Sequence, residues 1–306
     1  MNILITGGTG LLGMALQKAA PKGNNVFSIY RTRESLLIPL VFPSKPADVT
    51  EKTEMQRVFE WSQPDVVIHT AAIGSVDFAE KNREQAYSVN VGGVKMICDL
   101  CRQFDARLIH ISSNAVFDGK SPLYAEDSTT NPVNYYGELK LEGEKLIELS
   151  GLDYAVVRPI LFYGWPYPGR RDNLVTWCIK SLEAGKSIKV VNDVLSKPLF
   201  VGSCAEVVWA IVMKMKSGIY HVAGKDHITL YELAVRTADV FDLDPELISP
   251  VSSDHFKNIA PRPEDTSFDT SKMEQDLGIT PIGAEEGLQM MKATRPGNVR
   301  GSIDKA

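Results

Sequence analysis

The 306-residue sequence lacks any apolar run near the roughly 18 residues that a membrane-spanning helix requires. Its first residues enter an apolar stretch at once, without the basic segment that opens a secretory signal peptide. It also lacks an excess of positive charge, because 38 acidic residues outnumber 33 basic ones and leave a net charge of −5. We therefore expect a cytoplasmic protein that binds neither membranes nor nucleic acids.

Cysteine and histidine are scarce, and neither shows the spacing of a metal site. Among four cysteines, Cys98 and Cys101 form one C-x-x-C without the second pair that would complete a zinc site. Because their neighbours are apolar and helix-like, we interpret them as core residues, with a redox pair as the alternative. We expect His69 and His110, near strand ends, to be packed and hydrogen-bonded rather than to bind metal. No metal is predicted.

What the first half does contain is an alternation of apolar strands and helical stretches, which is typical of βαβ units and a parallel sheet. Strands are expected at 2–6, 26–30, 65–70, 107–111 and 154–158, and helices at 11–20, 55–62, 84–104 and 136–149. The second half is less regular. We predict a doubly wound parallel sheet of the Rossmann type, formed by 1–160 with 188–224, and a smaller substrate-binding lobe formed by 161–187 with 225–306.

The first strand runs directly into a glycine-rich loop that opens a helix. Gly7 allows the tight turn, Gly10 lets the backbone approach a pyrophosphate, and Gly13 lets the helix pack closely on the sheet. The N-terminus of that helix then presents free N–H groups to the anion. The sequence therefore predicts a dinucleotide site that also includes Thr9, Leu11 and Leu12.

The end of the second strand selects between the two nicotinamide cofactors. An acidic residue there binds the ribose hydroxyl of NAD, whereas arginine accommodates the 2′-phosphate of NADP. Here Arg31 and Arg33 come first, and a carboxylate follows only at Glu34. The pattern predicts NADP(H) over NAD(H), with solvated surface arginines as the alternative.

A Y-x-x-x-K pattern begins the helix expected at 136–149. Tyr136 and Lys140 share one helical face, where a lysine can lower the pKa of a nearby phenol. Ser113, one strand earlier, can hydrogen-bond a substrate carbonyl. The alternative is an ordinary amphipathic helix start in which Lys140 pairs with Glu144.

In this order, these motifs resemble the extended short-chain dehydrogenase/reductases, and most closely the dTDP-4-dehydrorhamnose reductase branch. The resemblance covers nearly the whole chain. Its further segments are Ala71-Ala72 with Val76-Asp77-Phe78-Ala79-Glu80, then 110–119, 131–144, Arg262-Pro263 and 268–272.

The resemblance implies roles for individual residues. Tyr136 would protonate a carbonyl oxygen, Lys140 would bind the nicotinamide ribose, and Ser113 would hold the carbonyl. The cofactor would also meet Asp48, Val49, Ala71, Ala72, Ile73, Asn90 and Pro159. The substrate would meet Ser75, Val76, Asn114 and Arg262. A homodimer through the helices at 84–104 and 136–149 is implied as well. The first helix carries apolar residues enough for both the core and the partner, namely Ala86, Val89, Val94, Ile97 and Leu100.

Two departures from the family pattern bear on function. Asn114-Ala115 stands where the reductase branch has Asp-Tyr, and the loop at 163–172 carries the additional Arg170 and Arg171, which either contact a nucleotide diphosphate or are solvated. The leading hypothesis is an NADPH-dependent reductase of a nucleotide-linked 4-keto-6-deoxy sugar. The alternatives are an epimerase or dehydratase with bound NAD, and a non-catalytic NADP-binding subunit similar to the regulatory subunit of S-adenosylmethionine synthetase.

Overall fold

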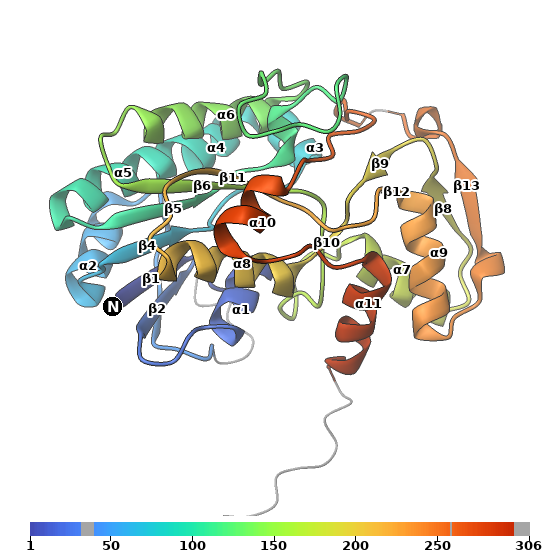
Figure 1. The fold of residues 1–306 in the computed structure, drawn as a ribbon, viewed down its shortest axis with the longest axis horizontal. Coiled ribbons are helices and arrows are strands. Elements are labelled where there is room, and N and C mark those ends of the chain that lie inside the picture. The colour runs from blue at the N-terminus through green and yellow to red at the C-terminus, as the bar shows by residue number, and fades with distance from the viewer. Residues whose placement is uncertain (32–39, 258, 297–306) are drawn as a thin grey trace, which may run out of the picture.

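A parallel sheet of seven strands organises the computed structural model, which describes residues 1–31, 40–257 and 259–296 (Figure 1). Its strand order is β11-β6-β5-β4-β1-β2-β3. The strands are β1 (Asn2–Thr6), β2 (Asn25–Tyr30), β3 (Ser44–Pro46), β4 (Val66–His69), β5 (Arg107–Ile111), β6 (Tyr154–Pro159) and β11 (Gly218–Val222). The predicted doubly wound sheet is confirmed.

Alternating residues of the strands feed two separate cores. In β1, Ile3 and Ile5 pack against one set of helices, while Leu4 points to the opposite face of the sheet. The first face is covered by α1 (Leu11–Lys18), α8 (Val201–Met213) and α10 (Ser271–Leu277), and the second by α2 (Lys52–Ser62), α5 (Gly93–Phe104) and α6 (Tyr135–Glu148) (Figure 1). Because both faces are covered, the strands read as continuous apolar runs.

The smaller lobe lies beyond the carboxyl ends of the strands, beside α8 (Figure 1). Its helices are α7 (Leu174–Glu183), α9 (Leu230–Phe241) and α11 (Ala284–Ala293). Its short strands pair as β10 (Leu199–Phe200) with β7 (Phe162–Tyr163), β12 (Ile228–Thr229) with β9 (Leu195–Ser196), and β13 (Ile248–Val251) with β8 (Ile188–Val191). The predicted domain division stays a prediction, but β8 within its 188–224 segment pairs with β13 and not with the large sheet.

The helix expected at 84–104 is not a uniform α-helix. It comprises α4 (Arg83–Tyr87), a π-helical segment (Ser88–Gly92) and α5. The short α3 (Val76–Lys81) precedes it. The periodicity of apolar residues in the sequence identifies the helix but does not reveal its π-helical turn. Such π-helical turns are often found at functional sites.

The apolar residues from which a dimer surface was expected lie inside the chain. Ala86, Val94, Ile97 and Leu100 are buried, and the half-buried Val89 packs against the same core as α5. Four of these five side chains therefore pack in the core of the chain itself, and the predicted homodimer stays a prediction.

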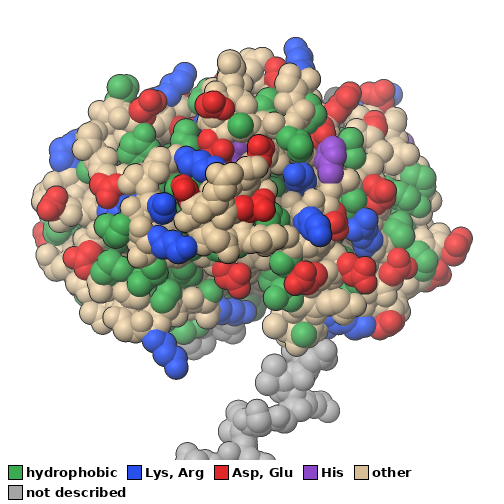
Figure 2. Space-filling view, viewed as in Figure 1, with side chains coloured by type: hydrophobic (Ala, Val, Ile, Leu, Met, Phe, Trp, Pro, Cys, Tyr) green, Lys and Arg blue, Asp and Glu red, His purple; other side chains and the backbone are tan. Residues whose placement is uncertain are grey.

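The two cysteines of the C-x-x-C pack in the same core, as residues of the apolar face of α5. Cys98 and Cys101 are buried in α5, and burial raises the pKa of the Cys98 thiol to about 12. No helix of the described residues is long and apolar enough to cross a membrane. Figure 2 shows acidic and basic side chains intermingled over the face that it presents.

Candidate active site

The glycine-rich loop leaves no room for side chains where it turns into α1. Gly7 adopts a left-handed φ of +72°, and a Cβ at Gly13 would lie 2.3 Å from the Gly7 carbonyl oxygen. Gly10 is the N-cap of α1, and no side chain among the described residues caps that helix end. The backbone N–H groups of the first turn are therefore available to an anion.

A cavity of about 320 Å³ opens beside this loop. Its lining joins the loop to the ends of β2 and β4 and to the segment after β3. The lining residues include the predicted Gly7, Thr9, Gly10, Arg31, Asp48, Val49, Ala71, Ala72 and Ile73, together with Ile29, Tyr30, Ala47, Thr70, Val89 and Arg170. Leu11, Leu12, Gly13 and Pro159 do not line it. Arg33 lies outside the described residues.

Asn90 reaches this cavity indirectly, from the π-helical segment. Its side-chain Oδ1 accepts a hydrogen bond from the Ile73 backbone N–H at 2.8 Å, and its Nδ2 donates to the Ile73 carbonyl at 3.1 Å. Both polar atoms of the buried amide thus hold one residue of the cavity wall. Asn90 supports the segment after β4 rather than lining the cavity itself.

The predicted catalytic side chains come together because α6 approaches the turn after β5 at very short range. A Cβ at Gly137 would lie 2.2 Å from the Ala115 carbonyl oxygen, so only glycine permits this approach. The N-cap Asn134 accepts a hydrogen bond from Gly137 at 2.9 Å and fixes the start of α6. As a result, the side chains of Ser113 and Tyr136 lie next to each other, and the Ser113 hydroxyl acts to lower the pKa of Tyr136.

The electrostatics of this cluster differ from our expectation. The Lys140 ammonium donates to the Ile111 carbonyl at 2.7 Å, and burial lowers the pKa of Lys140 to about 8. Burial also raises the pKa of Tyr136, against a smaller lowering by the Ser113 hydrogen bond. Desolvation therefore dominates, and the pKa of Tyr136 lies above its ordinary value rather than below it.

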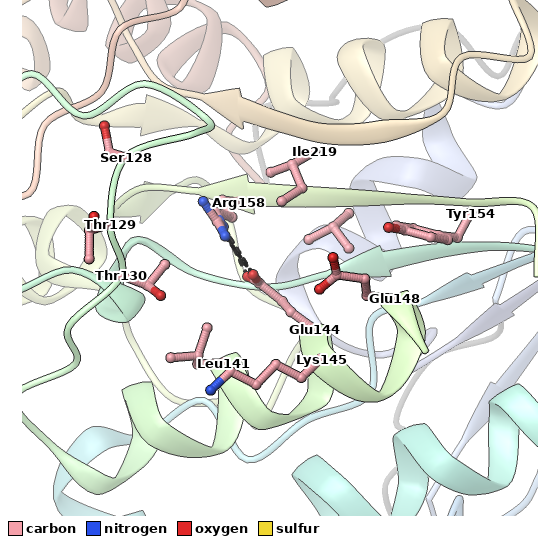
Figure 3. Close-up of a pocket in the computed structure, with 11 residues that line it drawn as sticks. Ser128, Thr129, Thr130, Leu141, Glu144, Lys145, Glu148, Tyr154, Arg158 and Ile219 are labelled. Atoms are coloured by element: carbon pink, nitrogen blue, oxygen red, sulfur yellow. Dashed lines mark hydrogen bonds and ion pairs between the residues drawn. The ribbon is translucent and has the colours of Figure 1, made fainter. Parts of the chain in front are cut away.

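Glu144 does not pair with Lys140, which removes the alternative of a simple helix-surface ion pair. Its carboxylate is buried and accepts hydrogen bonds from Arg158, whose Nη2 lies 2.6 Å from Oε2, and from the Ser112 hydroxyl. Figure 3 shows this pair on the wall of a second cavity, of about 330 Å³, between α6, β6 and residues 128–130. Glu144 thus ties α6, which carries Tyr136 and Lys140, to β6 through Arg158 and to the turn after β5 through Ser112.

A segment near the C-terminus, residues 260–266, contacts the turn that carries Ser113 and Asn114. Asn114 donates from Nδ2 to the Thr266 hydroxyl at 2.6 Å, and Ser113 donates to Asn114 Oδ1 at 3.3 Å. Arg262 forms an ion pair with Asp77, with Nη2 2.8 Å from Oδ2.

The remaining predicted substrate residues lie at the start of α3. Ser75 is the N-cap, accepting a hydrogen bond from Phe78, and Val76 is the first helical residue. Residues 260–266 therefore connect α3 to the turn that holds Ser113.

A glycine-rich cradle, a Ser-Tyr-Lys cluster and a C-terminal segment bonded to the turn beside that cluster define the class as the extended short-chain dehydrogenase/reductases. The chain matches the family described as "RmlD substrate binding domain" over residues 1–295. It belongs to that family, which confirms the resemblance seen in the sequence.

Two curated relatives and one crystal structure show which proteins of known name the chain is similar to. It is 33% identical over 287 residues to a dTDP-4-dehydrorhamnose reductase of Mycolicibacterium smegmatis, covering 92% of this chain and 81% of the relative. It is 31% identical over 296 residues to methionine adenosyltransferase 2 subunit beta of Xenopus tropicalis, covering 93% and 86%. A crystal structure of dTDP-4-dehydrorhamnose reductase from Bacillus anthracis in complex with NADP superimposes with a TM-score of 0.82 at 26% identity, covering 96% and 99%.

Proposed function

We propose that this chain is an NADPH-dependent reductase of a nucleotide-linked 4-keto-6-deoxy sugar. The observation that carries the proposal is the contact of Ser113 with Tyr136, next to Lys140 and on a chain with a glycine-rich dinucleotide cradle. A Cβ at Gly13 would lie 2.3 Å from the Gly7 carbonyl oxygen, and a Cβ at Gly7 would lie 2.7 Å from the Thr70 hydroxyl. This tight turn without side chains fits the close approach of a pyrophosphate.

When bound, NADPH supplies the hydride that converts the ketone carbon to a secondary alcohol. Tyr136 donates a proton to the ketone oxygen, and the Ser113 hydroxyl stabilises the negative charge that develops there. The buried Lys140 binds the nicotinamide ribose while the Ile111 carbonyl holds its ammonium in place. Arg31, in the wall of the cofactor cavity, pairs with the 2′-phosphate.

Substitution of Tyr136 tests the chemistry, with the adjacent Tyr135 as a matched control. We expect Tyr136→Phe to slow single-turnover NADPH oxidation by a nucleotide 4-keto sugar about 10²–10⁴-fold while NADPH affinity stays unchanged. Tyr135→Phe removes a hydroxyl that donates to the Arg83 carbonyl at 3.5 Å, on the protein surface, and should behave as wild type. Equal loss in both variants would contradict the assignment.

A second candidate, an NADP-binding regulatory subunit, is favoured by the similarity to methionine adenosyltransferase 2 subunit beta and by Asn114 in place of aspartate. The same experiment separates the two. Wild type that binds NADPH but reduces no sugar in a panel of nucleotide 4-keto sugars would support the regulatory role.

Three further expectations stay predictions. The first is the alternative function of an epimerase or dehydratase that uses NAD(H). Arg31 disfavours it, because a guanidinium in the cavity wall suits the 2′-phosphate that NAD(H) lacks. The cytoplasmic location is unchanged as a prediction. The homodimer also stays a prediction, since most of the apolar residues named for it pack in the core of the chain.

A further inference from the structure

Arg170 reaches from the smaller lobe to the glycine-rich loop. It lies between β7 and α7, 161 positions after Thr9, yet its Nη2 donates to the Thr9 hydroxyl. It lines the same cavity as Gly7 and Gly10. A single side chain from the lobe thus enters the wall of the predicted cofactor site.

The backbone that carries Arg170 is anchored. Its N–H donates to the Tyr167 carbonyl at 3.0 Å, and the side chain of Tyr167 is buried. Between them, Gly169 adopts a left-handed φ of +74° that closes the turn. The turn therefore holds Arg170 towards the loop.

The charge of Arg170 is available to an anion. Among the described residues, Arg170 forms no ion pair with a carboxylate, and Thr9 is its hydrogen-bond partner. Asp48, the acidic residue of the cavity wall, uses Oδ1 to accept from the N–H and the hydroxyl of Thr50. A planar guanidinium with several N–H donors matches phosphate oxygens, and the loop N–H groups face the same space.

We propose that Arg170 binds the pyrophosphate of the dinucleotide from the side opposite the glycine-rich loop, so that the cofactor is held by the large sheet and the smaller lobe together. This inference rests on the dinucleotide binding of the proposed function. The two arginines then bind different phosphate groups of the cofactor. Arg31 binds the 2′-phosphate, and Arg170 binds the pyrophosphate.

Two ligands separate the phosphate groups, because 2′-AMP carries the 2′-phosphate without a pyrophosphate and NADP⁺ carries both. In calorimetric titrations, Arg170→Gln should weaken NADP⁺ binding about 10-fold or more and change 2′-AMP binding less than about twofold. Arg31→Ala should weaken both ligands. Arg170→Lys should fall between wild type and Arg170→Gln, because a point charge replaces a bidentate donor.

Arg171→Gln is the matched control, since Arg171 is the exposed next residue and does not line the cavity. It should leave both affinities unchanged. The inference is overturned if Arg170→Gln binds NADP⁺ as wild type does, or if it weakens NADP⁺ and 2′-AMP equally. Wild type is titrated first: a wild type that does not bind NADP⁺ overturns the proposed function itself, whereas a bound wild type with an unaffected Arg170→Gln variant overturns only this inference.

Discussion

Neutralising Glu144 should destabilise the protein far more than neutralising a surface carboxylate. The Glu144–Arg158 pair is nearly inaccessible, with side-chain exposures of 7% and 4%. In Glu144→Gln the Arg158 guanidinium stays buried without a countercharge, and breaking such a pair costs about 3–5 kcal/mol. We expect the free energy of unfolding at pH 7, measured by urea denaturation and circular dichroism, to fall by that amount.

The control for this prediction is an exposed pair on the neighbouring helix. Asp99 lies 3.1 Å from Arg102, with side-chain exposures of 59% and 54%, so solvent screens the interaction. Asp99→Asn should change the free energy of unfolding by less than about 1 kcal/mol. The double variant Glu144→Leu/Arg158→Met should recover most of the loss, because it leaves no buried charge. A Glu144→Gln variant no less stable than Asp99→Asn would refute the reasoning.

The same substitution should alter the pH dependence of turnover. Burial lowers the pKa of Lys140 to about 8, and the Glu144 carboxylate opposes that lowering. Glu144→Gln removes the opposing charge, so the pKa of Lys140 should fall further. The alkaline limb of a turnover profile should therefore move to lower pH in the folded variant, whereas a purely structural role would leave its position unchanged.

Three other perturbations have defined outcomes. Gly13→Ala places a Cβ 2.3 Å from the Gly7 carbonyl and should abolish NADPH binding in a fluorescence titration, whereas Gly92→Ala, with its closest neighbour at 4.0 Å, should bind normally. Burial lowers the pKa of His69 and His221 to about 3, so both stay neutral in the folded protein, whereas in the unfolded chain they become protonated near pH 6.5. The free energy of unfolding should therefore be highest above pH 6.5 and fall by about 2 kcal/mol per histidine at pH 5. An unchanged denaturation midpoint between pH 7 and pH 5 would contradict this. Thr266→Val leaves the Asn114 amide without its acceptor and should destabilise the protein by about 1–3 kcal/mol, measured by urea denaturation.

Local chemistry explains which features the sequence predicts. The glycine-rich loop is recognisable because its backbone conformation and close contacts exclude other residues, as Gly7 and Gly13 show. The strands are recognisable because a sheet covered on both faces requires continuous apolar runs. Tyr136 and Lys140 are recognisable because their helical spacing follows the glycine-rich loop and Ser113 in the chain.

Features that depend on distant partners are not predicted in this way. The role of Gly137 depends on the Ala115 carbonyl, and that of Arg170 on Thr9 across 161 positions. The burial that raises the pKa of Tyr136 comes from the folded surroundings and outweighs its hydrogen bond to Ser113. Likewise, the apolar residues of α5 could face either a core or a partner, and only the tertiary structure shows that Val94 and Ile97 face the core.

Residues 260–266, which bond to the turn beside Ser113, are synthesised late, so a nascent chain can complete its catalytic site only near the end of translation. Asn114 bonds Thr266, 152 positions later, and Asp77 pairs with Arg262 after 185. A ribosome that adds about 5–20 residues per second needs roughly 8–30 s to synthesise the stretch between Asn114 and Thr266. During that time the large sheet lacks β11 until residue 222 emerges, and the catalytic side chains stay uncovered. Translation itself therefore keeps the hydride-transfer site incomplete until most of the chain exists.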